Sequence, residues 1–467
     1  MSNTAPFIQG STMRHVVVMA STASLGLMTL FVVDLADMYF LSLLGESELA
    51  AAIGYAGTIL FFTTSICIGI AIAAGALVSR SLGEENIARA KQYSTNVSVF
   101  GVVLATLVSI GVWVFIPTFL DLLGAKGESK AFAIDYLQII IPSMIVMALA
   151  MSGSGILRAA GDAKRSMYAT VSGGIVNAVL DPILIFSFSM GIKGAAWASV
   201  VARITVAAIA FYGVAKHHEL IARFEFRKFA ADLKDMVKIA IPAILTNVAT
   251  PFGNAYVIAS IAKFGDSAVA GMSIVGRLVP VAFGVVFALS GAVGPIIGQN
   301  VGAKKMDRVL QTLKDAIVFA TVTVTTAAVL LYLLQNMIIT GFNATGDAAV
   351  IISLFCTWVA ISFIFNGMLF ISNACFNNLG YAHYSTLINF AKATLGTIPF
   401  VYLGGVLGQF EGVLIGQAVG TVVTGTIALI ICFKMVHRCL RMNAPTGNRE
   451  KPFNPKIPLW PQTNTRG

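Results

Sequence analysis

The sequence predicts an all-α membrane protein with about twelve transmembrane helices, arranged as two similar bundles of six. Three observations predict this class. Of the 467 residues, 57% are hydrophobic and only 11% are charged, whereas a soluble domain carries about a quarter charged residues. Apolar runs recur along the whole chain, each near or above the ~20 residues that a helix needs to cross a bilayer. Several short motifs occur twice, at a nearly constant distance.

The apolar runs mark the expected transmembrane helices. They lie at residues 15–42, 51–78, 92–119, 131–157, 166–188, 194–214, 236–262, 269–300, 311–341, 348–378, 382–405 and 411–433.

The connections between these runs alternate in charge. One set is basic and includes Arg80, Arg158, Arg223 and Lys304, whereas the other set is acidic or mixed and includes Asp121. Cytoplasmic loops carry an excess of lysine and arginine, so the basic set is expected in the cytoplasm. The net charge of +10 therefore reflects membrane orientation and not a nucleic-acid partner.

The domain organisation follows from the same pattern. We expect a first lobe at 15–216 and a second lobe at 237–435, each with six helices. The charged stretch 217–236 is expected to link them as an amphipathic helix on the cytoplasmic surface. Residues 1–14 and the tail 436–467 are expected in the cytoplasm, and the Pro- and Asn-rich tail has a composition typical of flexible segments.

The repeated motifs relate the two lobes. Gly83 in SRSLGEENIARAKQ corresponds to Gly302 in GQNVGAKKMDRVLQ, and Gly161 corresponds to Gly380, in both cases 219 residues later. Because six helices separate the copies, the repeats are parallel and related by an axis along the membrane normal. A cavity between the two bundles is then the expected substrate site.

Carboxylates at membrane depth point to the chemistry. The first helix carries Asp34 and Asp37, three residues apart, and the fifth carries Asn177 and Asp181, four apart. Each pair can share one helix face. Intramembrane carboxylates are rare and costly, so function is the default interpretation. The alternative is a structural hydrogen bond, most plausibly for Asp181, because Pro182 follows it.

The acids are confined to the first lobe. In the repeat, Val257 stands opposite Asp37, and Asn254 stands opposite Asp34. Asp181 likewise stands opposite Ile398. A purely architectural role would predict polar groups in both lobes, so the asymmetry favours a proton or cation site.

Four segments together resemble the multidrug and toxic compound extrusion (MATE) family over roughly residues 15–435. They are LADMYFLSLLGESELAAAIG, SRSLGEENIARAKQ, LRAAGDAKRSM, and VNAVLDPILIF followed by GAAWAS. The resemblance is closest to the bacterial and archaeal DinF-like branch. It implies an amino-lobe cation site at Asp37, Asn177 and Asp181, with a family tyrosine at Tyr136, and with Ser154 and Ser199 where Asn and Thr are more usual.

One position departs from the family pattern. A proline near the start of the first helix is common in the family, and this chain has Thr22 there. A bend in this helix would therefore have to come from Gly26 and its Ser/Thr neighbours, because a kink needs an identifiable cause.

The leading functional hypothesis is a proton-coupled antiporter that exports organic, often cationic, compounds by alternating access. It would be a monomer in the cytoplasmic membrane of a bacterium or archaeon, with small organic molecules and lipids as partners. Sodium coupling at Asp37, Asn177 and Asp181 is one alternative. A lipid or polysaccharide-precursor flippase is another alternative. A groove for its headgroups would need more inward-facing arginines and lysines than this chain has.

Two further ionisable residues lie at membrane depth in the second lobe, Arg277 and Lys392. They are candidates for a polar cluster there, and the alternative is packing against carbonyls or snorkelling, which also applies to Arg203. The sequence has no HExxH, no GxSxG with partners and no P-loop, so an enzyme is not expected. The scattered cysteines and histidines predict neither a metal site nor a cofactor.

Overall fold

The structure is a computed structural model that describes residues 5–44 and 47–443. Its regular elements in these ranges are all helices, as the sequence predicts. The first lobe contains η1 (Pro6–Ile8), α1 (Thr12–Ser42), α2 (Ser47–Gly83), α3 (Ile87–Val114), α4 (Ile116–Leu122), α5 (Gly127–Ile140), α6 (Met144–Ala159), α7 (Ala163–Pro182), η2 (Ile183–Ser187), α8 (Gly191–Tyr212) and η3 (Gly213–His217).

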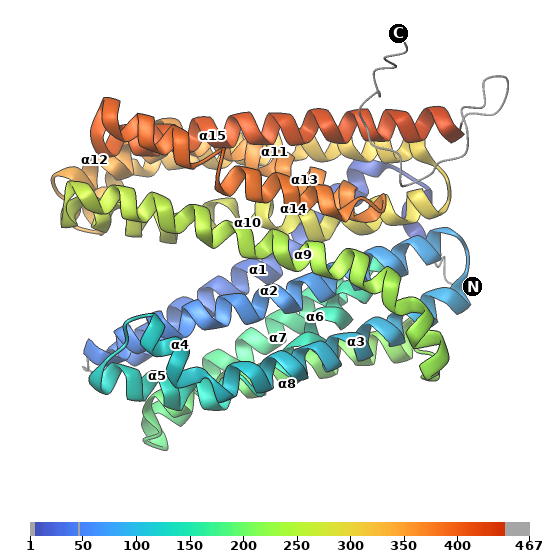
Figure 1. The fold of residues 1–467 in the computed structure, drawn as a ribbon, viewed down its shortest axis with the longest axis horizontal. Helices are drawn as coiled ribbons and strands as arrows, with labels where there is room; N and C mark the ends of the chain where they lie inside the picture. Colours follow the sequence, from blue (N-terminus) through green and yellow to red (C-terminus); the bar gives the residue numbers. More distant parts are fainter. Residues whose placement is uncertain (1–4, 45–46, 444–467) are drawn as a thin grey trace, which may run out of the picture.

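The second lobe contains α9 (Phe226–Ile261), η4 (Ala262–Phe264), α10 (Asp266–Gly302), α11 (Met306–Gly341), α12 (Asp347–Leu354), η5 (Phe355–Val359), η6 (Ala360–Ser362), α13 (Phe363–Asn378), α14 (Ala382–Ala393) and α15 (Ile398–Asn443). In Figure 1 the first lobe forms the lower layer of helices and α10–α15 form the upper layer, and α9 crosses from the lower layer at the right to the upper layer at the left. The tail from residue 444 lies outside the described residues.

The fourth expected helix is broken. The apolar run 131–157 forms α5 and α6, which meet at an angle of 54°. Pro142 lies at the break, where it cannot continue the backbone hydrogen bonds of a helix. Arg203 on α8 donates from Nη1 to the Ile140 carbonyl at 3.2 Å and to Ser143 Oγ at 2.7 Å. Arg203 therefore satisfies backbone that the bend sets free, which membranes require.

The last helix is a hairpin. Inside α15, Gln409 has a φ of +51°. A Cβ on Gly412 would lie 1.9 Å from the carbonyl oxygen of Gly404, and one on Gly420 would lie 1.6 Å from that of Gly396. The chain therefore reverses direction at Gln409, and two antiparallel helices pack with backbones in contact.

This hairpin explains the difference between the number of apolar helical stretches and the expected number of membrane spans. Within the described residues, ten helical stretches are long and apolar enough to span a membrane, and the bent α5–α6 pair makes eleven. One of the ten is a 61-residue stretch, Ala382–Met442. Dividing it at the Gln409 turn gives the twelve expected spans.

An approximate twofold axis relates the lobes. A Cβ on Gly83 would lie 2.0 Å from the Gln299 carbonyl oxygen, and a Cβ on Gly302 would lie 2.1 Å from the Arg80 carbonyl oxygen. Gln299 and Gly302 each follow their partner in the repeat by 219 residues. The contact between the ends of α2 and α10 is therefore reciprocal, and the axis passes between them.

The connections near this contact and the helix ends that flank them define one end of the molecule, which we call the basic end because lysine and arginine outnumber the acids there: residues 80–91, 158–165, 216–234 and 303–308. The linker between the lobes lies here. Residues 218–225 are not helical, and α9 begins at Phe226 and continues without a break into its spanning part. The expected separate surface helix over 217–236 is thus replaced by the first turns of a long helix.

A buried acid fixes α9 to the first lobe. Asp232 is fully buried. It pairs with Arg89 at 2.7 Å and accepts from Gln92 Nε2 and Asn96 Nδ2, each at 2.7 Å. We call Arg89, Gln92, Asn96 and Asp232 the first clamp. It ties α3 of the first lobe to the opening turns of the second.

A second clamp ties the start of the chain to α11. It consists of Arg308, Gln311 and Asp315 with residues 7–12, and its three α11 positions lie 219 residues after those of the first clamp. Arg308 donates to the Phe7 carbonyl at 2.9 Å. Asp315 accepts from Thr12 Oγ1 at 2.5 Å and from Gln311 Nε2 at 2.8 Å. The lobes are therefore joined crosswise at the basic end, toward which the two layers converge in Figure 1.

Candidate cation site in the first lobe

Helices α1 and α7 pack along a seam of small residues. A Cβ on Gly174 would lie 2.7 Å from Thr29 Cγ2, and one on Gly26 would lie 3.6 Å from Thr170 Cβ. Small residues of this kind let membrane helices approach closely. α1 is one helix from Thr12 to Ser42, so Gly26 acts here as a packing position rather than a bend.

The seam ends in a buried polar cluster. Asn177 Nδ2 donates to Asp37 Oδ1 at 2.9 Å and to Asp181 Oδ2 at 2.8 Å. Asp181 is fully buried, and Asn177 is 3% exposed. Asp181 Oδ1 has no hydrogen-bond partner among the residues that the structure describes. The structure thus brings three predicted site residues, from two helices, into one hydrogen-bonded group.

The charges in this cluster are unbalanced. Asp37 and Asp181 lie close enough for their carboxyl groups to interact, and one neutral amide bridges them. Two carboxylates that share one site repel each other, and a proton on either one relieves that repulsion. Asp34 is exposed, and its charge interacts with that of Asp37. Asp34 therefore stands beside the cluster and not within its hydrogen bonds.

Of the remaining first-lobe candidates, Tyr136 lies within electrostatic reach of the cluster, and Ser199 lies beside Tyr136. The Tyr136 phenol on α5 interacts with the Ser199 side chain on α8, and electrostatically with Asp37 and Arg203. Ser154 is buried on α6. No hydrogen bond joins Ser154 to these carboxyls in the described part of the chain, so the structure does not bring this residue to the cluster.

The two second-lobe candidates do not meet. Lys392, in the last turn of α14, donates from Nζ to Asn366 Oδ1 on α13. Arg277 is exposed on α10 and has neither a hydrogen bond nor an ion pair within the described residues. Of these two candidates, only Lys392 therefore forms a polar contact inside the second lobe.

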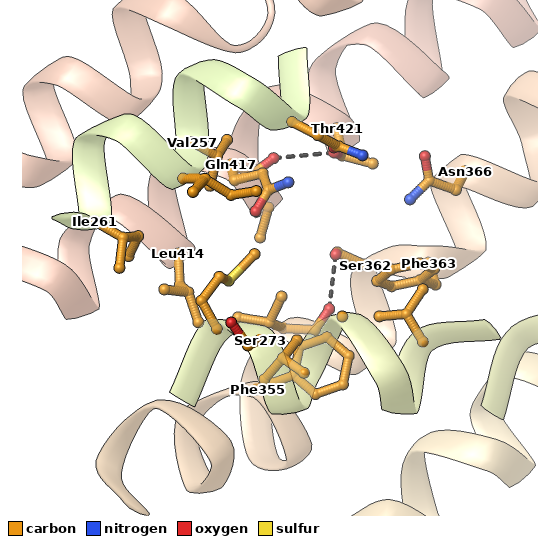
Figure 2. Close-up of a pocket in the computed structure, with 18 of the residues that line it drawn as sticks. Val257, Ile261, Ser273, Phe355, Ser362, Phe363, Asn366, Leu414, Gln417 and Thr421 are labelled. Carbon is orange, nitrogen blue, oxygen red and sulfur yellow. Dashed lines mark hydrogen bonds between the residues drawn. The ribbon is translucent and has the colours of Figure 1, made fainter. Parts of the chain in front are cut away.

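Sequence reasoning missed a cavity of about 390 Å³ in the second lobe. It lies between α9, α10, α13 and α15, and its polar walls include Asn254, Asn366 and Gln417. Figure 2 shows Asn366 and Gln417 reaching it from different helices. Carboxamides inside apolar runs were the available signal, but they carry no charge and so did not stand out.

Two crosswise-joined six-helix lobes around an internal twofold axis, with two carboxyls bridged by an amide inside the first of them, define the architecture of a polytopic membrane transporter. The MatE family model matches the chain twice, over residues 23–183 and 242–403. The chain belongs to this family, whose members are transporters and not enzymes. The two matched segments begin 219 residues apart, which is the spacing of the repeat.

Relatives cover nearly the whole chain. It is 27% identical to an FAD transporter of Shewanella oneidensis, over 91% of this chain and 94% of that protein. It is 24% identical to the multidrug export protein MepA of Staphylococcus aureus, over 86% of this chain and 89% of that protein. The structure of VcmN, a MATE transporter of Vibrio cholerae, matches with a TM-score of 0.87 at 24% identity, over 94% of this chain and 99% of that one.

Proposed function

We propose that this transporter is a proton-coupled antiporter that exports organic, often cationic, compounds from the cytoplasm. The observation that most directly supports this proposal is the pair of hydrogen bonds from Asn177 to Asp37 and Asp181, at 2.9 and 2.8 Å. In this proposal one proton binds the acidic pair, removes a local negative charge, and loosens the hold of α7 on α1. The seam then shifts and the lobes exchange access between the two sides of the membrane.

The hydrogen bonds of Asn177 suit a site that takes up a proton. Its Nδ2, a donor, faces both carboxyls. A sodium ion would need the amide oxygen there instead, because hard cations bind oxygen ligands. Sodium coupling at Asp37, Asn177 and Asp181 remains the alternative. It requires the amide to turn over when the ion arrives.

The energy of one proton is sufficient for useful export. A proton that moves inward under about 100 mV releases about 2.3 kcal/mol, before any pH gradient. This free energy supports a gradient of roughly fiftyfold for a neutral compound.

Orientation follows from charge. The basic end is proposed to face the cytoplasm of a bacterium or archaeon, because cytoplasmic connections carry the excess of lysine and arginine. Both clamps lie at this end, so this structure would correspond to the outward-facing state, closed to the cytoplasm.

The test is transport by the purified protein in liposomes with an imposed pH gradient or an imposed sodium gradient. We expect the pH gradient alone to drive accumulation of an organic cation such as ethidium, and expect the Asp37→Asn/Asp181→Asn double variant to lose it. Asp347→Asn, a neutralised acid at the start of α12, is the matched control. Undiminished pH-driven transport in the double variant would refute the proposal, and transport driven only by sodium would favour the alternative.

A second candidate substrate class is an organic anion. The relative from Shewanella is an FAD transporter over 94% of its length, and FAD carries phosphate groups. The specific observation in this chain is Lys392, a cation inside the second lobe whose hydrogen-bond partner is the neutral Asn366.

A further inference from the structure

The second-lobe cavity occupies the place that the acidic site has in the first lobe. Two of its wall residues, Phe355 and Ala418, follow Tyr136 and Ser199 by 219 residues. Asn254 and Val257 of its wall follow Asp34 and Asp37 by 220. The twofold axis therefore relates the cavity to the cation site, with uncharged residues in place of the acids.

No charged side chain lines this cavity among the described residues, and Lys392 contacts its wall from behind, through Asn366. Lys392 Nζ donates to Asn366, a wall residue, and Gly253, next to the wall residue Asn254, lies against Ala393. Lys392 thus sits where α9, α13 and α14 meet. No carboxylate forms an ion pair with it among the described residues. An ammonium has three protons to donate, and Asn366 accepts one of them.

The rest of the wall suits an amphipathic guest. Phe287, Phe355, Phe363 and Met272 supply aromatic and thioether surface, which adapts to flat apolar groups. Figure 2 shows Phe355 and Phe363 on the side of the cavity away from Gln417. A volume of about 390 Å³ lies in the range of small-molecule sites.

We propose that this cavity binds organic anions, through a carboxylate or phosphate on Lys392 and an apolar body against the phenylalanines. The inference deepens the second candidate of the proposed function, the export of organic anions, and rests on it for its physiological meaning. The two lobes would then have opposite polarity. The first loads a proton on its acids, and the second recognises the negative group of the compound that is exported.

Binding to the protein in lipid nanodiscs tests the proposal without any gradient. Pyrenebutyrate and pyrenebutyramide share one fluorophore and differ in the charged group. We expect the wild type to bind the carboxylate at least about tenfold more tightly than the amide, as a single desolvated charge contact allows. Lys392→Gln should remove this preference and leave amide binding unchanged, and Lys392→Arg should retain it.

A second variant distinguishes loss of the anion site from a folding defect in Lys392→Gln. Asn366→Asp keeps the shape of the wall and gives Lys392 an acidic partner, so it should also abolish the preference. Equal affinity for the two probes in the wild type, or a preference that survives both Lys392→Gln and Asn366→Asp, would overturn the inference and leave Lys392 as a helix-end residue.

The Asp37→Asn variant separates this inference from the proposed function. It should keep the carboxylate preference in nanodiscs while it loses pH-driven transport in liposomes. If the wild type shows no pH-driven transport but the preference holds, the coupling proposal fails and the binding site stands. If transport depends on Asp37 but Lys392→Gln changes the affinity for neither probe, the anion-site inference is wrong and the proton-coupling proposal stands.

Discussion

At the residue scale, the charged site residues could be identified from the sequence, but the residues that contact them could not. Asp37, Asn177 and Asp181 stood out because a carboxylate within an apolar run needs an explanation, and the structure joins them through one amide. Lys392 stood out for the same reason, but its partner Asn366 did not. A neutral amide inside an apolar run becomes informative only when the fold shows which helix faces it.

Replacement of Asn177 by alanine should uncouple the site. The change leaves the Asp37 and Asp181 acceptors without their shared donor, and each buried unsatisfied group costs about 1–3 kcal/mol. We expect loss of pH-driven transport together with a lower unfolding temperature in detergent. Thr394→Ala, at the corresponding position of the second lobe, is the control and should retain both. An Asn177→Ala variant with wild-type coupling would show that the bridge is dispensable.

Asp162 at the basic end should make stability depend on acid. Burial acts to raise the pKa of this carboxyl, but hydrogen bonds from His218 and Arg165 outweigh it and hold the pKa at about 2. Because the folded pKa is depressed, the stabilisation is complete above the unfolded pKa of about 3.9 and is lost as the pH falls toward 2.

Unfolding temperatures of the wild type and of Asp162→Asn measure this effect. The wild type should be the more stable at pH 6, by about 1–2 kcal/mol for a partly exposed group. The difference should shrink between pH 4 and pH 2.5. A difference that stays constant over this range would mean that Asp162 contributes through shape and not through its charge.

At the element scale, hydropathy located the spans but not their breaks. The run 131–157 is apolar throughout, so its composition could not show that α5 and α6 meet at 54°. Pro142 was the local signal, and Arg203, more than sixty positions away, supplies the compensating donor. The turn at Gln409 was visible only as a short polar interruption between two runs. Hydropathy reports burial in lipid, whereas breaks depend on partners from other helices.

The α15 hairpin should tolerate no side chain at its crossing point. A Cβ on Gly412 would lie 1.9 Å from a backbone oxygen, so the two helices must separate to admit even alanine. Loss of close packing at such a site costs about 1–3 kcal/mol or more. We expect Gly412→Ala to lower the unfolding temperature and the yield of folded protein.

Gly111→Ala gives the matched comparison within a helix. A Cβ there would meet nothing within 4 Å, and alanine is the better helix former by about 1 kcal/mol. This variant should be as stable as the wild type or more so. Equal stability of Gly412→Ala and Gly111→Ala would contradict the backbone contact that defines the hairpin.

At the scale of the whole molecule, the internal repeat was the most informative feature of the sequence. Its spacing of 219 residues reappears in the reciprocal contact of Gly83 and Gly302. It reappears in the two clamps, which occupy equivalent positions on α3 and α11. The repeat could not show that the first residues of each lobe pack against the other lobe. This packing depends on the side chains of Asp232 and Arg308, whose partners lie far away in the chain.

The clamps should set the balance between the two access states. Asp232 holds three donors in a fully buried place, and removal of one partner of a buried ion pair costs about 3–5 kcal/mol. Only part of this cost falls on one state, but each 1.4 kcal/mol changes the ratio of the states about tenfold. The Asp232→Asn/Arg308→Ala variant should therefore favour conformations that are open at the basic end.

Spin labels at the opposite end report this change, because a lobe rotation that opens one end closes the other. Leu122 on α4 and Leu407 before the Gln409 turn are 79% and 85% exposed, and the five native cysteines would first be replaced. We expect the double variant to move the measured distances to shorter values than in the wild type. Arg80→Gln, which removes an exposed pair with Glu84 just after the end of α2, should leave them unchanged. An unaltered distribution in the double variant would mean that the glycine contact between α2 and α10 closes the basic end by itself, and that the clamps only position the start of each lobe.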